Sequence, residues 1–161
     1  MLSRIANKLH DEHEATLGLA ARVSRLIQVS GDTPPDPTEA RVERTLDELA
    51  QAISGEVRRH FFLEEEALFP ILRADGHGAI ADLLTLEHQE ILPIGDEVGA
   101  LVAEMRKKAI SDSEWRQFCQ LGQDFFHRLM AHIEKEEAGL IPLVDECLDR
   151  EAEARILSQY S

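Results

Sequence analysis

The chain has 161 residues, enough for one folded domain with a sizeable core, and a formal net charge of −14 from 31 acidic and 17 basic side chains. This charge repels phosphate groups, which argues against nucleic acid and anionic membrane surfaces as partners. No apolar run approaches the ~18 residues of a membrane span, and the first residues contain no signal-peptide core, so we expect a cytoplasmic protein.

Strong helix formers dominate the chain and strand patterns are nearly absent, which predicts an all-α fold. Glycines, prolines and candidate capping serines interrupt the pattern at residues 31–37, 74–78 and 110–115. These breaks delimit predicted helices at about 2–29, 38–73, 79–109 and 113–148, followed by a short C-terminal helix. Long helices with short connections form an up-down-up-down four-helix bundle, so we treat residues 1–161 as a single domain.

Each of the four long helices carries a stripe of apolar residues three and four apart, the pattern of one buried face. A histidine occupies that face in every helix, and in the second and fourth helices a glutamate follows one turn later. Residues four apart have Cβ atoms only about 5–6 Å apart on one helix face, so these polar side chains are expected to meet in the core. They are His13, His60, Glu64, His88, His132 and Glu136.

A sequence repeat supports this site. The segment HFFLEEEALFP at 60–70 recurs as HIEKEEAGLIP at 132–142, an offset of 72 residues. Because an unpaired buried carboxylate costs several kcal/mol, two of them in a core require a cation or another charge partner. Imidazole and carboxylate ligands suit first-row metals, and carboxylates can bridge two ions about 3.5–4 Å apart. We therefore predict two iron ions; zinc and manganese fit the same ligands, and a metal-free bundle with Glu–His hydrogen bonds is the alternative interpretation.

The other polar residues near the stripes have simpler interpretations. His77 lies in a loop and is expected to be exposed, and His127 is expected to face outward or toward a neighbour. His10 lies about 60° away from the stripe, so we favour His13 as the ligand and keep His10 as the alternate or a neighbour. The remaining glutamates of the two repeats, Glu65, Glu66 and Glu137, are interpreted as parts of solvated faces.

Three further predictions concern small residues on the stripes, two prolines and the two cysteines. Ala6, Ala67, Ala81 and Gly139 fall on one level of the stripes and could leave a channel to the site, unless the flanking leucines fill it. Pro70 and Pro142 each follow a predicted ligand by six residues and predict a kink or a helix end. Cys119 and Cys147 are too far apart on one helix for a disulfide, so we interpret them as reduced thiols without a readable function.

Four segments of the sequence resemble the hemerythrin-like, or HHE cation-binding, domains: DEHEATL at 11–17, HFFLEEEALFP at 60–70, LEHQEI at 86–91 and HIEKEEAGLIP at 132–142. The resemblance implies a four-helix bundle around a non-haem di-iron centre that is bridged by the two HxxxE carboxylates. The family ligands then fall on His13 (or His10), His60, Glu64, His88, His132 and Glu136.

The resemblance also directs the functional prediction. Oxygen-carrying hemerythrins have a second histidine one turn along helix three and HxxxxD in helix four, whereas this chain has leucines at 84 and 92 and Glu136. The pattern is more similar to the iron-sulfur-cluster-repair di-iron proteins and to eukaryotic iron- and oxygen-sensing domains. Because this sequence has no counterpart of the cysteine-bearing N-terminal domain of the repair proteins, we do not carry over their specific activity.

We therefore predict a di-iron protein that binds dioxygen, nitric oxide or peroxide, in sensing or in protection against oxidative or nitrosative stress. The alternatives are an iron-dependent peroxidase or oxidase that uses the same centre, and a protein that takes up and delivers iron. The sequence contains no readable general base or substrate pocket, and nothing in it determines the oligomeric state.

Overall fold

The computed structural model describes residues 2–160, which fold into helices without any strand. The first long helix is α1 (Arg4–Ser30). The second consists of α2 (Ala40–Gln51), the π-helical η1 (Ala52–Glu56), α3 (Val57–Leu63), the π-helical η2 (Glu64–Leu68) and α4 (Phe69–Ala74). The third is α5 (Gly78–Lys107), and the fourth runs through α6 (Asp112–Lys135), the π-helical η3 (Glu136–Leu140) and α7 (Ile141–Cys147). The short α8 (Arg150–Tyr160) follows.

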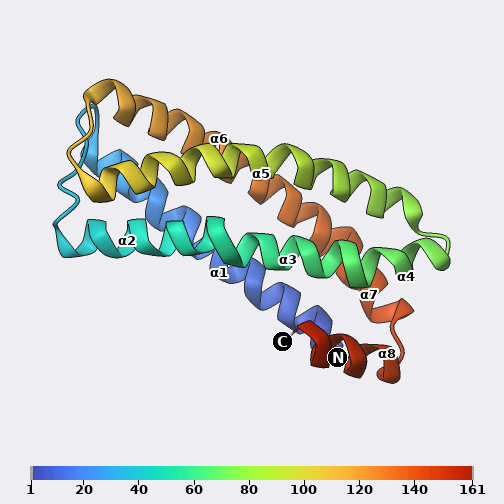
Figure 1. Ribbon diagram of the computed structural model, residues 1–161. Coiled ribbons are helices and arrows are strands. Elements are labelled where there is room, and N and C mark those ends of the chain that lie inside the picture. The colour runs from blue at the N-terminus through green and yellow to red at the C-terminus, as the bar shows by residue number, and fades with distance from the viewer. Residues whose placement is uncertain (1, 161) are drawn as a thin grey trace.

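The predicted all-α bundle with a short C-terminal helix is confirmed. The predicted domain 1–161 includes Met1 and Ser161, which lie outside the described residues. Helix α1 packs against α2 and against α6 and α7, while α5 packs against α2, α4 and α6, so α1 and α5 lie on opposite corners of the bundle (Figure 1). None of the helices among residues 2–160 is long and apolar enough to cross a membrane.

Local sequence signals account for several helix ends. Ser111 begins α6 with a capping box: its hydroxyl accepts from the Glu114 N–H, and the Glu114 carboxylate accepts from the Ser111 N–H. At the N-terminal end of α1, the free N–H groups of Arg4 and Ile5 donate to the Glu153 carboxylate of α8. This contact holds α8 beside the start of α1, where both described ends of the chain lie (Figure 1).

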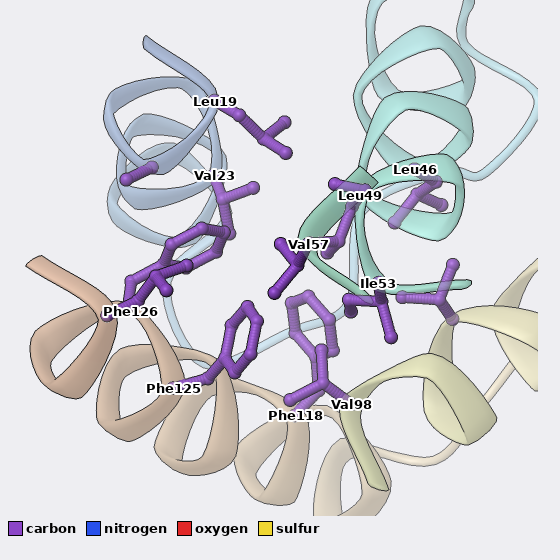
Figure 2. Close-up of a cluster of buried hydrophobic side chains, with 14 of the residues drawn as sticks. Leu19, Val23, Leu46, Leu49, Ile53, Val57, Val98, Phe118, Phe125 and Phe126 are labelled. Carbon is purple, nitrogen blue, oxygen red and sulfur yellow. The ribbon is translucent and has the colours of Figure 1, made fainter. Parts of the chain in front are cut away.

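The apolar core consists of two clusters, one on either side of the histidines. The larger cluster joins the second half of α1 to α2, α3, α5 and α6 (Figure 2), and the smaller one joins the start of α1 to α4, α7 and α8. In the larger cluster Gly95 faces Phe125, because a Cβ built on Gly95 would lie 2.9 Å from that ring. The polar stripe residues therefore occupy a layer that is apolar above and below.

Two of the π-helical segments begin at the repeated glutamates, and they show that the helix end, one of the two expectations for Pro70 and Pro142, does not occur there. The backbone hydrogen bonds of the helices continue up to Pro70 and Pro142. The Phe69 N–H donates to the Glu64 carbonyl, and the Ile141 N–H donates to the Glu136 carbonyl. These bonds span five residues rather than four. A proline cannot donate and its ring clashes with the carbonyl four residues earlier, so a widened turn just before it accommodates the ring.

The extra residue in each widened turn also closes the predicted channel. Beyond Glu64 and Glu136 the buried positions shift by one, so that Leu68 and Leu140 enter the core at 0% exposure while Ala67 and Gly139 are only half-buried. The expectation that Ala6, Ala67, Ala81 and Gly139 share one open level was wrong, because it continued the α-helical period through a π-helical turn. The flanking leucines, which were the alternative, fill this level.

Candidate metal centre

The six predicted site residues come together in the layer between the two apolar clusters. Glu64 and Glu136 are fully buried, and the four histidines are at most 9% exposed, a value reached only by His60. His13 comes from α1, His60 from α3, His88 from α5 and His132 from α6, while each glutamate begins a π-helical segment. Every long helix thus contributes one imidazole, as the stripes predicted.

The donor atoms fall into two overlapping groups of four. The first group contains His13, His60, Glu64 and Glu136, and in it one donor atom from each residue lies within 4.8 Å of the others. The second contains His88 and His132 with the same two glutamates, at the same spacing. Two four-donor groups that share both carboxylates are the arrangement that a carboxylate-bridged pair of cations requires.

The interior of this layer has more acceptors than donors. The Nε2 atoms of His13 and His60 lie 3.3 Å apart, and those of His88 and His132 lie 3.1 Å apart. Both carboxylate oxygens of Glu64 and Oε1 of Glu136 are buried without a well-aligned hydrogen bond from the described residues, and their polar neighbours are imidazole Nε2 atoms, such as His60 Nε2 at 3.1 Å and His88 Nε2 at 3.2 Å from Glu64. Leaving buried oxygens unsatisfied is costly, and a cation placed among them would satisfy them, so the residues present fit a metal.

A second set of four carboxylates holds the outer nitrogen of each imidazole. Because a carboxylate can only accept, each Nδ1 carries a proton and donates, which leaves Nε2 as the nitrogen that faces the interior. The four pairs are His13 with Glu137 at 2.5 Å, His60 with Glu12 at 2.7 Å, His88 with Glu65 at 3.0 Å and His132 with Glu87 at 2.8 Å. Such carboxylate–imidazole pairs fix the ring orientation of metal-binding histidines and raise their basicity.

These outer carboxylates correct the interpretation of Glu65 and Glu137 as solvated. Each lies one residue after a repeated glutamate and reaches across to a histidine on a neighbouring helix. Glu12 and Glu87, which the sequence reasoning did not single out, each come one residue before a histidine. These four positions share a sequence pattern, since EH occurs at both 12–13 and 87–88 and EE at both 64–65 and 136–137, but the pattern does not show which histidine each carboxylate contacts.

The three remaining histidines lie outside the layer. The half-exposed His10 ring contacts the Glu137 carboxylate at 3.1 Å, so it neighbours an outer carboxylate of the site, whereas His13 lies inside the layer. His127 is exposed on α6, as expected. His77 is half-buried rather than exposed, because its turn packs against the end of α7.

The electrostatics of the metal-free layer follow from this crowding. Burial alone would lower the pKa of His88, but contacts with Glu136, Glu64 and Glu65 outweigh it and raise that pKa to about 9. In the same way, the charge of Glu64 and hydrogen bonds to Glu12 and Glu136 raise the pKa of His60 well above 6.5 despite its burial. Burial opposes ionisation of Glu136, yet its four imidazole neighbours hold its pKa well below 4.5.

A cavity of about 720 Å³ opens between α1 and α3 and reaches the layer at His13 and His60 of the first donor group and at His132 of the second. Its inner wall includes His13, His60 and Glu136, and the side chains of Lys8, Arg59 and Tyr160 also line it. Neither His88 nor Glu64 contributes to its lining. A small molecule can therefore approach the centre from the His13–His60 side.

Aromatic rings cover the opposite half. Phe61 stacks on His88 with ring centroids 3.7 Å apart, and Phe69 lies nearly parallel to the same imidazole at 5.9 Å. In the repeat, Phe61 corresponds to Ile133 and Phe69 to Ile141, so the other half has aliphatic side chains at the equivalent positions. Ile133 and its repeat counterpart Phe61 both line the cavity.

The fold and the layer together define a class: an antiparallel helical bundle whose core holds two overlapping groups of imidazole and carboxylate donors that fit metal ions. The sequence model of a family described as "Hemerythrin HHE cation binding domain" matches residues 4–144. The chain belongs to this family, and its resemblance to the hemerythrin-like domains is thereby confirmed. Metal binding is the property that the family description states.

Curated relatives share the same region at lower similarity. The chain is 28% identical over 147 residues to the iron-sulfur cluster repair protein YtfE of Yersinia pseudotuberculosis serotype O:1b, and 27% identical to the protein of that name from Yersinia pestis strain Pestoides F. In both cases the match covers 88% of this chain and 63% of the relative, so the chain spans less than two thirds of their length. No solved structure matches the chain.

Proposed function

We propose that the protein holds two iron ions in the buried layer and uses them to bind small oxidising molecules. The observation that carries this proposal is the pair of four-donor groups that share Glu64 and Glu136. Iron bound among imidazoles and carboxylates supplies reversible redox chemistry and open positions for a small ligand. The proposed ligands of the ions are His13, His60, Glu64, His88, His132 and Glu136.

The protein groups around these ligands have separate tasks in this proposal. The outer carboxylates, such as Glu87 on His132, keep each imidazole in the tautomer that can bind a cation. Phe61 and Phe69 exclude water from the His88 half. The cavity between α1 and α3 admits the incoming molecule on the His13–His60 side.

We further propose that the incoming molecule is dioxygen, nitric oxide or peroxide, and that binding serves protection against oxidative or nitrosative stress. The names of the relatives, which describe iron-sulfur cluster repair, support a role of this kind. Sensing would use the same centre, and so would turnover as a peroxidase or oxidase.

The decisive experiment is metal analysis of protein purified without oxygen, followed by absorption spectra after adding dioxygen and then nitric oxide. We expect two irons per chain and a spectral change with at least one of the gases. Protein that contains no metal and cannot be loaded would refute the proposal. A His132→Ala variant is expected to lose metal, and His127→Ala, a change of the same type at an exposed position of α6, is expected to keep it.

The same preparation separates the alternatives. Many turnovers of peroxide with a reductant would indicate a peroxidase, whereas one spectral change per centre would indicate binding. Rapid transfer of iron to a metal-free acceptor protein, with weak retention under chelation, would indicate iron delivery.

A further inference from the structure

A side-chain group far from the buried layer gathers three different metal-binding atoms. Asp75, His77 and Cys147 each offer one donor atom, and these atoms lie within 4.8 Å of one another. The group combines a carboxylate, an imidazole and a thiol, so it differs from the clusters of acidic residues that solvated surfaces carry. None of the three side chains takes part in the His/Glu centre.

The internal repeat explains how two of these residues meet. Asp75 follows the last residue of α4 and Cys147 is the last residue of α7, and each lies 11 residues beyond a repeated glutamate (75 − 64 and 147 − 136). Helices two and four of the bundle run in the same direction, and α4 contacts α7. Equivalent positions of the repeat therefore lie at the same level, roughly 16 Å from the glutamates along the helices.

A tight turn adds the third residue. Gly76 adopts a left-handed conformation with φ of 87°, which reverses the chain directly after Asp75. The Asp75 N–H donates to the Ile71 carbonyl at 3.1 Å, and the His77 N–H donates to the Leu72 carbonyl at 2.8 Å. The backbone that carries both side chains is thus held in place by the end of α4, before any ligand is considered.

The negative charges around the Cys147 thiol favour binding of a cation and disfavour a role of the thiol as a nucleophile. Burial raises the pKa of the Cys147 thiol to about 11, and the carboxylates of Asp75 and Glu146 add to this effect. A thiol of such high pKa is a weak nucleophile. Arg73, the basic residue closest in sequence to Asp75, is paired with Asp82 at 3.0 Å, so it does not neutralise the group.

We propose that Asp75, His77 and Cys147 form a second metal site, independent of the His/Glu centre, for a divalent cation of the zinc class. Thiolate, imidazole and carboxylate are the ligand types that zinc takes in proteins, and three protein ligands leave a fourth position for water or another ligand. Asp75 is exposed and the other two residues are half-buried, so the cation can enter and leave without unfolding of the bundle. Binding replaces the thiol proton, which is released to solvent.

The test uses Co²⁺ as a spectroscopic probe on protein whose His/Glu centre is already loaded with metal. Cobalt bound to a thiolate absorbs in the near ultraviolet, and because the His/Glu centre contains no cysteine this band reports only a cysteine ligand. We expect one equivalent of Co²⁺ to produce the band and Zn²⁺ to remove it by competition. The band should be absent in Cys147→Ser and present in Cys119→Ser, which changes the other half-buried cysteine.

Two further variants test the remaining ligands. His77→Ala and Asp75→Asn are each expected to weaken Zn²⁺ binding at least tenfold, while His127→Ala leaves it unchanged. Absence of the band in the unmodified protein, or its persistence in Cys147→Ser, would overturn the second site. These results do not depend on iron: the proposed di-iron centre can fail while the cobalt band appears, and the reverse also holds.

Discussion

The Glu87 carboxylate of α5 accepts a hydrogen bond from His132 Nδ1 of α6 at 2.8 Å, and its other oxygen accepts from Lys135. This contact fixes the tautomer of a buried imidazole from a helix that the imidazole does not belong to. Three further carboxylates make the equivalent contact with the other three imidazoles of the layer. The layer therefore depends on residues beyond its six central side chains.

Removal of the Glu87 carboxylate tests that dependence. We expect Glu87→Ala to weaken metal binding by about 10–100-fold, because His132 loses the partner that orients its ring. Competition with a chelator of known affinity measures the change. Glu97→Ala is the matched control, since Glu97 is exposed on the same helix, and equal affinities of the two variants would contradict the role assigned to Glu87.

His10 and His13, the two histidines of α1, should respond differently to substitution. His13 is buried in the layer, whereas the His10 ring is half-exposed and contacts only an outer carboxylate of the site. We expect His13→Ala to lose at least one metal ion per chain and His10→Ala to retain both, as measured by metal analysis after gel filtration. The opposite result would identify His10 as the ligand.

The metal-free and metal-bound forms should depend on pH in opposite directions. The raised pKa of His88, about 9 against 6.5, makes a stabilising contribution that is complete below pH 6.5 and is lost as the pH rises through 9. The lowered pKa of Glu136 makes a contribution that is complete above pH 4.5 and is lost as the pH falls through its folded value. We expect the metal-free protein to have its highest urea midpoint between pH 4.5 and 6.5.

Bound metal should reverse the loss of stability that the metal-free protein shows above pH 6.5. Imidazoles must lose a proton before they bind a cation, so affinity increases with pH over the range in which the metal-free protein loses stability. Urea titrations at pH 6 and pH 9, with and without metal, measure both trends. A metal-free protein that is more stable at pH 9 than at pH 6 would contradict the charged imidazole cluster.

The side of ligand entry can be tested by enlarging one residue. Ile133 lines the cavity and is smaller than its repeat counterpart Phe61, which lines the same cavity. We expect Ile133→Phe to slow the association of nitric oxide with the metal-loaded protein by about tenfold or more, as measured by stopped-flow absorption. Ile141→Phe is the control, because Ile141 is buried on the same long helix but does not line the cavity.

Both substitutions add volume to a packed region, at a cost in stability of about 1–3 kcal/mol each. Circular dichroism and metal content must therefore match before the rates are compared. An unchanged rate in a folded, metal-loaded Ile133→Phe protein would exclude the cavity as the route.

Two buried glycines offer a test of core packing. A Cβ on Gly95 would lie 2.9 Å from the Phe125 ring, whereas a Cβ on Gly122 would meet no atom within 4 Å. We expect Gly95→Ala to lower the free energy of unfolding by about 1–3 kcal/mol through overpacking. Gly122→Ala should raise it by about 0.5–1 kcal/mol through the higher helix propensity of alanine. Equal effects would contradict the packing.

The spacing of apolar residues in the sequence predicts the central site residues but does not predict the π-helical turns. The α-helical period located all six central side chains in one layer, because α1, α5 and α6 keep that period up to their histidines and α3 keeps it from His60 to Glu64, although the π-helical η1 interrupts the second long helix at 52–56. The period failed beyond the two central glutamates, where π-helical turns shift Leu68 and Leu140 into the core. Nothing in a count of apolar positions indicates such a turn, although the prolines after it are a local signal.

The outer carboxylates escaped prediction for a geometric reason. Glu137 follows Glu136 and so lies about 100° around the helix from it, on a face that a single-helix analysis assigns to solvent. Only the neighbouring helix, which carries His13, makes that position part of the site. Contacts between helices depend on rotation and spacing that the sequence of either helix does not contain.

The outer carboxylates also determine the charge that the layer can balance. Four outer and two central carboxylates surround four imidazoles, which are neutral when they bind metal, so these side chains contribute six negative charges. Lys8 pairs with Glu12 and Lys135 pairs with Glu87, and the two ammonium groups leave a net charge of −4. Two divalent cations would balance this sum, whereas two trivalent cations would leave two positive charges in excess. A diferric pair in this layer would therefore need further anionic ligands, and the cavity is where such ligands could enter.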